Sequence, residues 1–198
     1  FKTAYLTGAR RGELLGATWR YADLDKDVFW IVQDLDRPKG GGFVMGEVKS
    51  AHSKRPIRLP GSLTAELQAM RKRQVAERLR RGPCPKGSDC RTQHCPLWHD
   101  GDFIFCQRNG KPLHGHNLTV RDLKALCVRA KVPPLRFHDL RHLSATTLLR
   151  EGVSAKIVQE RMGHHAASFT LDAYSWATPD MQQVAVEALE RTLLRRRK

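Results

Sequence analysis

Apolar residues recur along most of the chain with the three-to-four-residue spacing of helices that bury one face. This spacing predicts helices over residues 11–16, 62–80, 117–130, 137–150, 154–163 and 180–194. In the second of these helices, the residues expected on the buried face are Leu63, Leu67, Met70 and Leu79. Asn117 and Ser154 stand at two of the expected helix starts, where a side-chain oxygen can accept a hydrogen bond from a free backbone amide.

β-Branched and aromatic residues gather in short runs at 28–32, 43–45 and 55–59, a composition that favours strands. Pro56 favours an edge position for the last run, because proline has no backbone N–H to donate to a neighbouring strand. We expect the three runs to form one antiparallel sheet. The predicted fold class is therefore α+β, mostly helical, with a small three-stranded antiparallel sheet.

The charge of the chain indicates the kind of partner. It has 35 Lys and Arg against 20 Asp and Glu, a net charge of +15, and a pI of about 10.2. A surplus of this size attracts polyanions, and a pI above 9 is typical of nucleic-acid-binding domains. The residues expected to contact DNA outside the site described next are Arg71, Lys72, Arg73, Arg80 and Arg81. No apolar run approaches the ~18 residues that span a bilayer, and we expect no secretory signal. The expected location is cytoplasmic, in a bacterial or phage-derived setting, and nucleoid-associated.

Three separated segments carry residue types suited to phosphoryl transfer without a metal ion. Guanidinium groups can neutralise the charge that develops on a phosphodiester. A tyrosine hydroxyl can attack phosphorus, and histidine or lysine can move protons. His138 and Arg141 are three positions apart on one predicted helix and so face the same spot. The candidates for this chemistry are Arg10, Lys49, His138, Arg141, His164 and Tyr174.

In this order the segments resemble the catalytic domain of tyrosine recombinases, the phage integrase family. The stretches that carry the resemblance are 7–14 (Thr-Gly-Ala-Arg-Arg-Gly-Glu-Leu), 49–57, 138–142 (His-Asp-Leu-Arg-His), 163–164 and 171–174 (Leu-Asp-Ala-Tyr). The resemblance implies that Arg10 and Arg141 are the two catalytic arginines and that Glu13 is the acidic partner of Arg10. It also implies the fold of that domain.

The mechanism that the resemblance implies begins with attack of Tyr174 on a DNA phosphate, giving a 3′-phosphotyrosyl link and a free 5′-hydroxyl. Lys49 would protonate the leaving 5′-oxygen, and His138 would assist proton transfer at the nucleophile. His164 and the two arginines would hold the non-bridging oxygens. No cofactor is expected for catalysis. The expected partners are double-stranded DNA and three further copies of the chain in a tetramer, with no membrane.

A cysteine-rich stretch interrupts the pattern of this family. Three of the five cysteines and one histidine follow the spacing Cys84-x5-Cys90-x4-Cys95-x3-His99. Disulfides are not expected in the cytoplasm, whereas three thiolates and an imidazole complete a closed tetrahedral zinc set. The spacing resembles that of CCCH zinc fingers and predicts a structural zinc ion, with His94 as a substitute for His99. The alternative is a loop whose thiols are incidental and redox-sensitive.

The expected organisation is a catalytic domain over 1–178 that contains a zinc-knuckle-like insert at 82–100, followed by a C-terminal helix and basic tail at 179–198. The DNA-clamping (core-binding) domain that normally precedes it in this family is expected to be absent. Three other functions stay open: a non-catalytic DNA-binding protein of the same fold, a DNA-relaxing enzyme similar to type IB topoisomerases, and a zinc-dependent nucleic-acid-binding module. The six filled positions argue against the first of these.

Overall fold

The computed structural model describes residues 1–38, 42–48, 53–87, 90, 92, 95–163, 183, 186, 187 and 190. The helical segments are α1 (Lys2–Thr7), α2 (Arg11–Leu15), the single turn η1 (Trp19–Tyr21), α3 (Gly61–Arg81), α4 (Gly115–Asn117), the π-helical segment η4 (Leu118–Leu123), α5 (Lys124–Ala130), α6 (Phe137–Arg150) and α7 (Ala155–Met162). The strands are β1 (Ala22–Asp23), β2 (Val28–Ile31), β3 (Gln33–Asp36), β4 (Val44–Glu47) and β5 (Arg55–Arg58). The α+β, mostly helical fold class is confirmed.

The strands form two small antiparallel sheets in the described part of the chain. β1, β2 and β5 make the three-stranded sheet in that order, with Phe29 opposite Ile57, and β3 pairs with β4. The prediction that 43–45 joins 28–32 and 55–59 was therefore wrong. The chain breaks its extended run at Val32 and continues as β3, so the 43–45 segment finds β3 as its partner. The edge position predicted for Pro56 is confirmed, because among the described strands β5 stands at one end of the sheet and pairs with β2.

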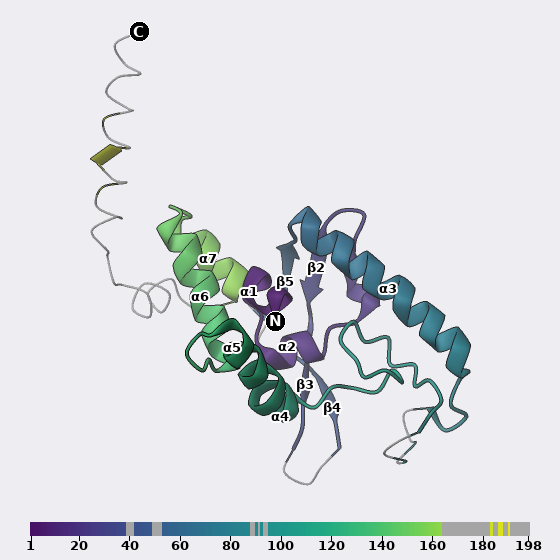
Figure 1. The fold of residues 1–198 in the computed structure, drawn as a ribbon. Helices are drawn as coiled ribbons and strands as arrows, with labels where there is room; N and C mark the ends of the chain where they lie inside the picture. Colours follow the sequence, from purple (N-terminus) through teal and green to yellow (C-terminus); the bar gives the residue numbers. More distant parts are fainter. Residues whose placement is uncertain are drawn as a thin grey trace.

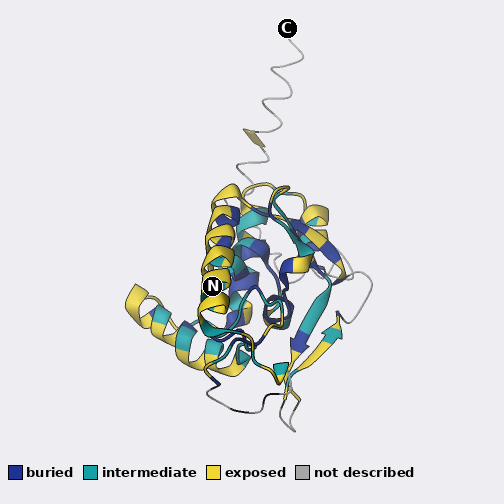
Figure 2. Ribbon diagram, turned by 90° about the vertical axis from the view of Figure 1, so that its right-hand side faces the viewer, coloured by how far each residue is buried: buried dark blue, intermediate teal, exposed yellow. Residues whose placement is uncertain are grey.

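The core lies between the three-stranded sheet and the helices that cover it. In Figure 1, α3 crosses one side of β2 and β5, and α1, α6 and α7 lie on the other side. The main cluster of buried residues joins the sheet to α3 and includes Ile31, Ile57 and Leu63, with Ile104 from a loop and Leu123 from η4, all nearly inaccessible to solvent. Ala145 of α6 packs with Val158 and Met162 of α7 in a second, smaller cluster. Figure 2 shows the buried residues gathered in this interior, while the outer faces of the helices are exposed. The sheet and helices together provide a rigid base for the residues described below.

Local signals predicted several helix boundaries correctly. Helix α6 has the predicted bounds, and the hydroxyl of Ser154 accepts a hydrogen bond from the backbone N–H of Ile157 (3.4 Å) at the start of α7. Gly163 ends α7 in the left-handed conformation, with φ of +66°. Asn117 is not an N-cap, because the helix begins earlier at Gly115 and continues through Asn117.

Leu79 does not belong to the buried face predicted for α3. Its side chain is 79% exposed, whereas Leu63 and Leu67 are buried and Met70 packs against the core. The first half of α3 packs against the core, whereas the second half extends beyond it. The apolar spacing therefore continues into a part of the helix where Leu79 has no core to pack against. Within the described residues, no helix combines the length and the apolar character needed to cross a membrane.

The predicted C-terminal helix and basic tail lie almost wholly outside the described residues. Of this span, Gln183, Val186, Glu187 and Glu190 are helical. The amide of Gln183 donates a hydrogen bond to the carboxylate of Glu187 one turn later (3.4 Å). The predicted bounds of this helix therefore stay a prediction.

Candidate active site

The turn between α1 and α2 positions Arg10. Gly8 ends α1 with φ of +65°, a backbone conformation that residues other than glycine rarely adopt. A Cβ at this position would lie 2.5 Å from the side chain of Met162. Arg10 then takes an extended conformation as the N-cap of α2, and its backbone N–H donates to Glu13 Oε2 (2.8 Å). Its Nη1 donates to Glu13 Oε1 (2.8 Å). The backbone and the side chain of Arg10 are thus both fixed by Glu13.

Glu13 is a buried carboxylate between two guanidinium groups. Its side chain is 1% exposed, and Arg55 donates from Nη2 to Oε2 (2.9 Å) and from Nη1 to Oε1 (3.2 Å). Burial alone would raise the pKa of Glu13, but the hydrogen bonds and charge of Arg55, together with those of Arg10, hold this pKa below its usual range. Glu13 is therefore charged at neutral pH.

The first two turns of α6 carry two further candidate residues, His138 and Arg141. Arg136 caps this helix: its backbone N–H donates to Asp139 Oδ2 (2.7 Å), and its guanidinium pairs with the same carboxylate. One turn in, Arg141 is 2% exposed and donates to the carbonyls of Gly8 and Met162, both at 2.6 Å. Arg141 thus connects α6 to the α1–α2 turn and to the end of α7.

His138 lies at the exposed start of α6. Its ring centroid is 4.5 Å from that of His142, edge to face. Partial desolvation, followed by the nearby His142 and Arg141, lowers the pKa of His138 below its usual value. The neutral imidazole therefore predominates at neutral pH, and a neutral imidazole can accept a proton.

These residues surround one pocket of about 750 Å³. Its walls include Arg10 at the N-cap of α2, Glu13 of α2, and His138 and Arg141 of α6. Val48 and Ser53, the described residues on either side of 49–52, also line it, as does Gly163. The other predicted catalytic residues, Lys49, His164 and Tyr174, lie outside the described residues. The structure thus brings together the four described members of the predicted set.

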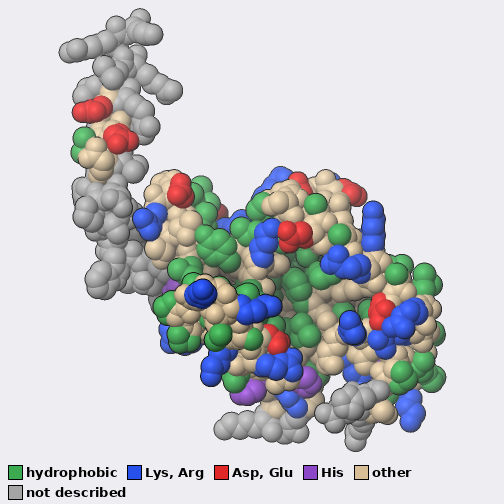
Figure 3. All heavy atoms as spheres, viewed as in Figure 1, with side chains coloured by type: hydrophobic (Ala, Val, Ile, Leu, Met, Phe, Trp, Pro, Cys, Tyr) green, Lys and Arg blue, Asp and Glu red, His purple; other side chains and the backbone are tan. Residues whose placement is uncertain are grey.

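The basic residues predicted to contact DNA on α3 do not line this pocket. Arg71 and Lys72 line a separate open groove with Arg20 and Trp30, and the Arg71 guanidinium lies 5.5 Å from the centre of the Trp19 ring. Arg73 is exposed on the same helix. Figure 3 shows Lys and Arg side chains spread over much of the visible face rather than gathered in one patch. Contact of these residues with DNA stays a prediction.

Arg80 and Arg81 form ion pairs with Glu77 on their own helix. The distances are 2.7 Å from Arg80 Nη2 and 2.8 Å from Arg81 Nε, and these hydrogen bonds lower the pKa of Glu77 to about 2. Arg81 also donates from Nη1 to the carbonyl of Pro96 (2.7 Å) and is half-buried. This arginine ties α3 to the cysteine-rich insert.

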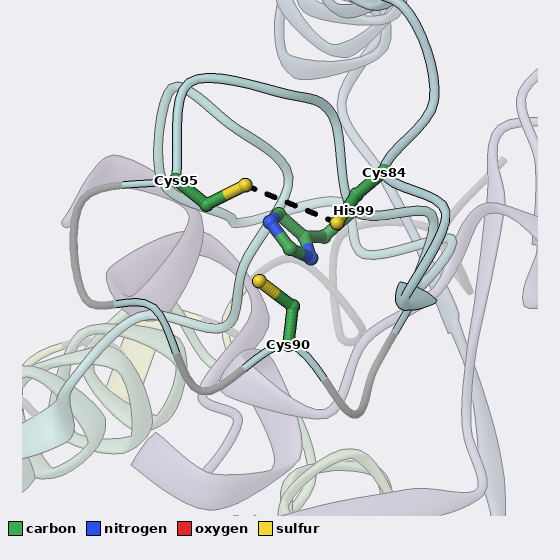
Figure 4. A group of neighbouring side chains, drawn as sticks. All are labelled: Cys84, Cys90, Cys95 and His99. Carbon is green, nitrogen blue, oxygen red and sulfur yellow. Dashed lines mark hydrogen bonds between the residues drawn. The ribbon is translucent and has the colours of Figure 1, made fainter.

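The four predicted zinc ligands converge in the insert. The sulfur atoms of Cys84, Cys90 and Cys95 and a ring nitrogen of His99 all lie within 4.8 Å of one another. Figure 4 shows the three sulfurs and the imidazole facing a common centre. The Sγ atoms of Cys84 and Cys95 are 3.9 Å apart, and none of the cysteines is in a disulfide. His94, the predicted substitute, lies outside the described residues.

The contacts of His99 orient its other ring nitrogen. Nδ1 lies 2.8 Å from the carbonyl oxygen of Gly87. A carbonyl can only accept, so Nδ1 carries the hydrogen and Nε2 presents a lone pair. Nε2 is buried and has no hydrogen-bond partner among the described residues. An unpartnered imidazole lone pair among three thiols is the arrangement that a tetrahedral zinc site requires, so the residues fit the metal.

The turn that contains Asn109 and Lys111 donates hydrogen bonds to the backbone of the cysteine loop. Asn109 Nδ2 donates to the carbonyl of Cys95 (2.9 Å), and Lys111 Nζ donates to the carbonyls of Cys90 (2.9 Å) and Thr92 (2.7 Å). These contacts hold the loop in place through backbone atoms. No pattern of residue types predicts these contacts.

Comparison of the structure with solved structures identifies the class of fold. The chain superposes on the Tn1549 transposon integrase, in a structure with transposon right end DNA, with a TM-score of 0.73 and 25% identity over 96% of this chain and 57% of that chain. The XerA recombinase gives a TM-score of 0.63 and 18% identity over 94% of this chain and 55% of that one, which supports the fold alone. The chain has the catalytic-domain fold of tyrosine recombinases.

Sequence comparison identifies the family. The profile of the phage integrase family matches residues 1–180, and the chain belongs to that family. It is 30% identical over 197 residues to the tyrosine recombinase XerC-like of Caldanaerobacter subterraneus subsp. tengcongensis, covering 96% of this chain and 48% of that protein. It is 26% identical over 195 residues to the ICEBs1 integrase of Bacillus subtilis, covering 96% and 47%. The chain therefore spans about half the length of these curated relatives.

Arg55 is the site residue to which the sequence analysis assigned no role. It is 5% exposed, and it binds Glu13 as well as the backbone of α7. The burial of Arg55 could have been predicted from its place in the strand. Side chains alternate between the two faces of a strand, so Arg55 shares the inward face with Ile57. An arginine on a buried face needs an acidic partner.

Proposed function

We propose that this chain is the catalytic domain of a site-specific recombinase that cuts and rejoins double-stranded DNA through a 3′-phosphotyrosyl intermediate on Tyr174. The observation that carries the proposal is the meeting of Arg10 and Arg141 in one pocket. These arginines bind neighbouring carbonyls at the end of α7: Arg141 Nη2 donates to Met162 (2.6 Å) and Arg10 Nη2 donates to Gly163 (3.3 Å). Membership of the phage integrase family supports the same reaction.

In the proposed reaction, the Tyr174 oxygen attacks the scissile phosphorus and the bond from phosphorus to the 5′-oxygen breaks. The tyrosine proton passes to His138, and Lys49 supplies a proton to the leaving 5′-oxygen. Arg10, Arg141 and His164 stabilise the charge on the non-bridging oxygens, which needs no metal because two guanidinium groups lie at one pocket. A 5′-hydroxyl then attacks the phosphotyrosyl bond and releases the tyrosine, so the exchange consumes no nucleotide cofactor.

The distribution of tyrosines supports Tyr174 as the nucleophile. The chain contains three. Tyr5 donates its hydroxyl hydrogen to Thr147 Oγ1 (3.2 Å), and Tyr21 lines the groove beside α3. Neither of them is among the residues that line the pocket of Arg10 and Arg141. Tyr174 is the remaining candidate.

The proposed partners are double-stranded DNA and three further copies of the chain. A relative of the same fold, the Tn1549 transposon integrase, has a structure in complex with transposon right end DNA. The net charge of +15 favours such a polyanion. Four protomers would cut and exchange the strands of two duplexes.

A nicked DNA substrate tests this function. The nick lets the short cut strand diffuse away, so the phosphotyrosyl intermediate cannot be resealed. We expect a protein–DNA adduct that survives denaturing electrophoresis and that rejoins to an added strand bearing a 5′-hydroxyl. DNA binding without an adduct would support the non-catalytic alternative. Relaxation of supercoiled DNA by the monomer, with no exchange between two duplexes, would support the topoisomerase-like alternative.

We further propose that Cys84, Cys90, Cys95 and His99 hold a structural zinc ion. Four protein ligands would fill a tetrahedral site, leaving no open position for catalysis. The ion would order a loop that contributes few apolar residues to the core. We also propose that the insert contacts DNA. Arg81 attaches the insert to α3, and further lysines and arginines flank it in the sequence.

Metal analysis tests the zinc proposal independently of activity. We expect about one zinc ion per folded chain, and its loss in Cys90→Ser. Chelation should lower the melting temperature, because a ligand bound only to the folded state at a thousand times its Kd stabilises it by about 4 kcal/mol.

Cys106→Ser is the matched control for the metal analysis, because Cys106 lies outside the cluster and its sulfur accepts a hydrogen bond from Gln74. This variant should keep the ion. A folded protein without zinc would contradict the proposal. Loss of DNA cleavage on chelation, in protein that stays folded, would favour the zinc-dependent module.

A further inference from the structure

Three arginines bind three successive backbone carbonyls at the end of α7. Arg55 Nε donates to Arg161 (2.7 Å), Arg141 Nη2 to Met162 (2.6 Å) and Arg10 Nη2 to Gly163 (3.3 Å). The last carbonyls of a helix lack partners within the helix and carry its partial negative charge, so cations are favoured there. Two of these arginines belong to the proposed reaction. The third, Arg55, has no part in it so far.

All three guanidinium nitrogens of Arg55 donate hydrogen bonds to described residues. Besides Arg161, it donates from Nη1 to the carbonyl of Ser53 (2.8 Å) and from Nη1 and Nη2 to the two oxygens of Glu13. Its side chain is 6% exposed. Gly163 has φ of +66°, a conformation that favours glycine, and a Cβ there would lie 2.8 Å from Arg55 Nη1, so glycine permits this close approach. Arg55 therefore has a single fixed position.

The position of Arg55 changes the charge available in the pocket. Glu13 carries one negative charge and accepts hydrogen bonds from both Arg10 and Arg55. With Arg55 present, the two arginines share that charge, and Arg10 keeps a net positive potential toward the pocket. Without Arg55, Glu13 and Arg10 would form a simple neutral pair, and Glu13 Oε2 would lose its side-chain partner. The attraction of Arg10 for a phosphate would then fall.

We propose that Arg55 is a positioning residue for the recombination chemistry. It neutralises and orients Glu13, so that Arg10 presents its charge to the scissile phosphate, and it fixes the end of α7 in the same geometry. The inference rests on the proposed function, because it assigns Arg55 a part in that reaction. It acts through Arg10 and Glu13 and makes no contact with DNA.

The test compares two DNA substrates, because a positioning role depends on the charge of the phosphate. One nicked substrate has a normal phosphodiester, and the other has a methylphosphonate, in which a neutral methyl group replaces one non-bridging oxygen. We expect Arg55→Met to slow single-turnover adduct formation at least about tenfold on the phosphodiester. On the methylphosphonate the slowing relative to wild type should be about twofold or less, because that phosphorus centre starts neutral and carries one negative charge fewer in the transition state, so it depends less on Arg10.

Arg58→Met is the matched control, since Arg58 is on the same strand but exposed, and donates to the carbonyl of Lys26 (3.2 Å). It should match wild type on both substrates. Arg55→Lys keeps the charge and should lose less than Arg55→Met on the phosphodiester. If Arg55→Met does not fold, the comparison is made with Arg55→Lys. This variant should also be slowed more on the phosphodiester than on the methylphosphonate, but by a smaller factor.

Equal slowing on both substrates, or no slowing on either, would overturn the positioning role. Equal slowing would mean that Arg55 only supports the fold. A wild-type protein that forms no adduct on the phosphodiester would overturn the proposed function itself. The two failures are distinguishable, because one appears in the wild type and the other only in the Arg55 variants.

Discussion

Replacing Tyr174 by phenylalanine is expected to abolish the covalent protein–DNA adduct. The substitution removes a single oxygen, and that oxygen is the proposed nucleophile, so no phosphotyrosyl bond can form. The affinity for DNA should change little, because the arginines that attract the phosphate are intact. The measurement is denaturing electrophoresis of the protein with a labelled nicked substrate, together with a binding titration under the same conditions.

Tyr21→Phe is the control for loss of a tyrosine hydroxyl elsewhere. Tyr21 belongs to η1 and lines the groove beside α3, away from the pocket of Arg10 and Arg141. This variant should form the adduct at the wild-type rate. An adduct that persists in Tyr174→Phe at the wild-type level would show that another residue is the nucleophile.

Replacing Arg141 by lysine is expected to have the second largest effect, slowing adduct formation by about 100-fold or more. Removing one donor that stabilises developing charge typically costs 10²–10³ in rate, about 3–4 kcal/mol. Lysine keeps the positive charge but cannot reproduce the planar arrangement of donors that lets Arg141 bind the carbonyls of Gly8 and Met162 and face the pocket. The measurement is the single-turnover rate on the nicked substrate.

Loss of the two carbonyl contacts also carries a structural cost. A buried polar group left without a partner costs about 1–3 kcal/mol, so Arg141→Lys should melt at a lower temperature than wild type. The rate is therefore compared at a temperature where both proteins are folded. Arg150→Lys, on the same helix but exposed, is the control and should retain the wild-type rate. A wild-type rate in Arg141→Lys would exclude Arg141 from the stabilisation of the phosphate.

Local features of the structure were predictable because local residues determine them. The bounds of α6 follow from its apolar spacing, and the start of α7 follows from the hydroxyl of Ser154. The placement of His138 and Arg141 on one helix follows from their spacing. Spacing and residue type also singled out Cys84, Cys90, Cys95 and His99, and the structure brings these four side chains close together, while the zinc ion itself stays a proposal.

Features that depend on distant partners could not be predicted in this way. Strand composition does not specify which strand is the neighbour, so the pairing of β3 with β4 was missed. The exposure of Leu79 depends on where the body of the protein ends, which the helix pattern does not show. Strand alternation indicates that Arg55 is buried and needs an acidic partner, but it does not indicate that this partner is Glu13. The contacts of Arg55 and Lys111 with backbone carbonyls could not be predicted either, because every residue has a carbonyl.

If Tyr174 carries the DNA after cleavage, mapping the covalent bond in the adduct will show it. The adduct is trimmed with nuclease, digested with protease and sequenced by tandem mass spectrometry. We predict a nucleotide joined through its 3′-phosphate to the hydroxyl oxygen of Tyr174. A nucleotide on any other residue, or one joined to Tyr174 through a 5′-phosphate, would contradict the account.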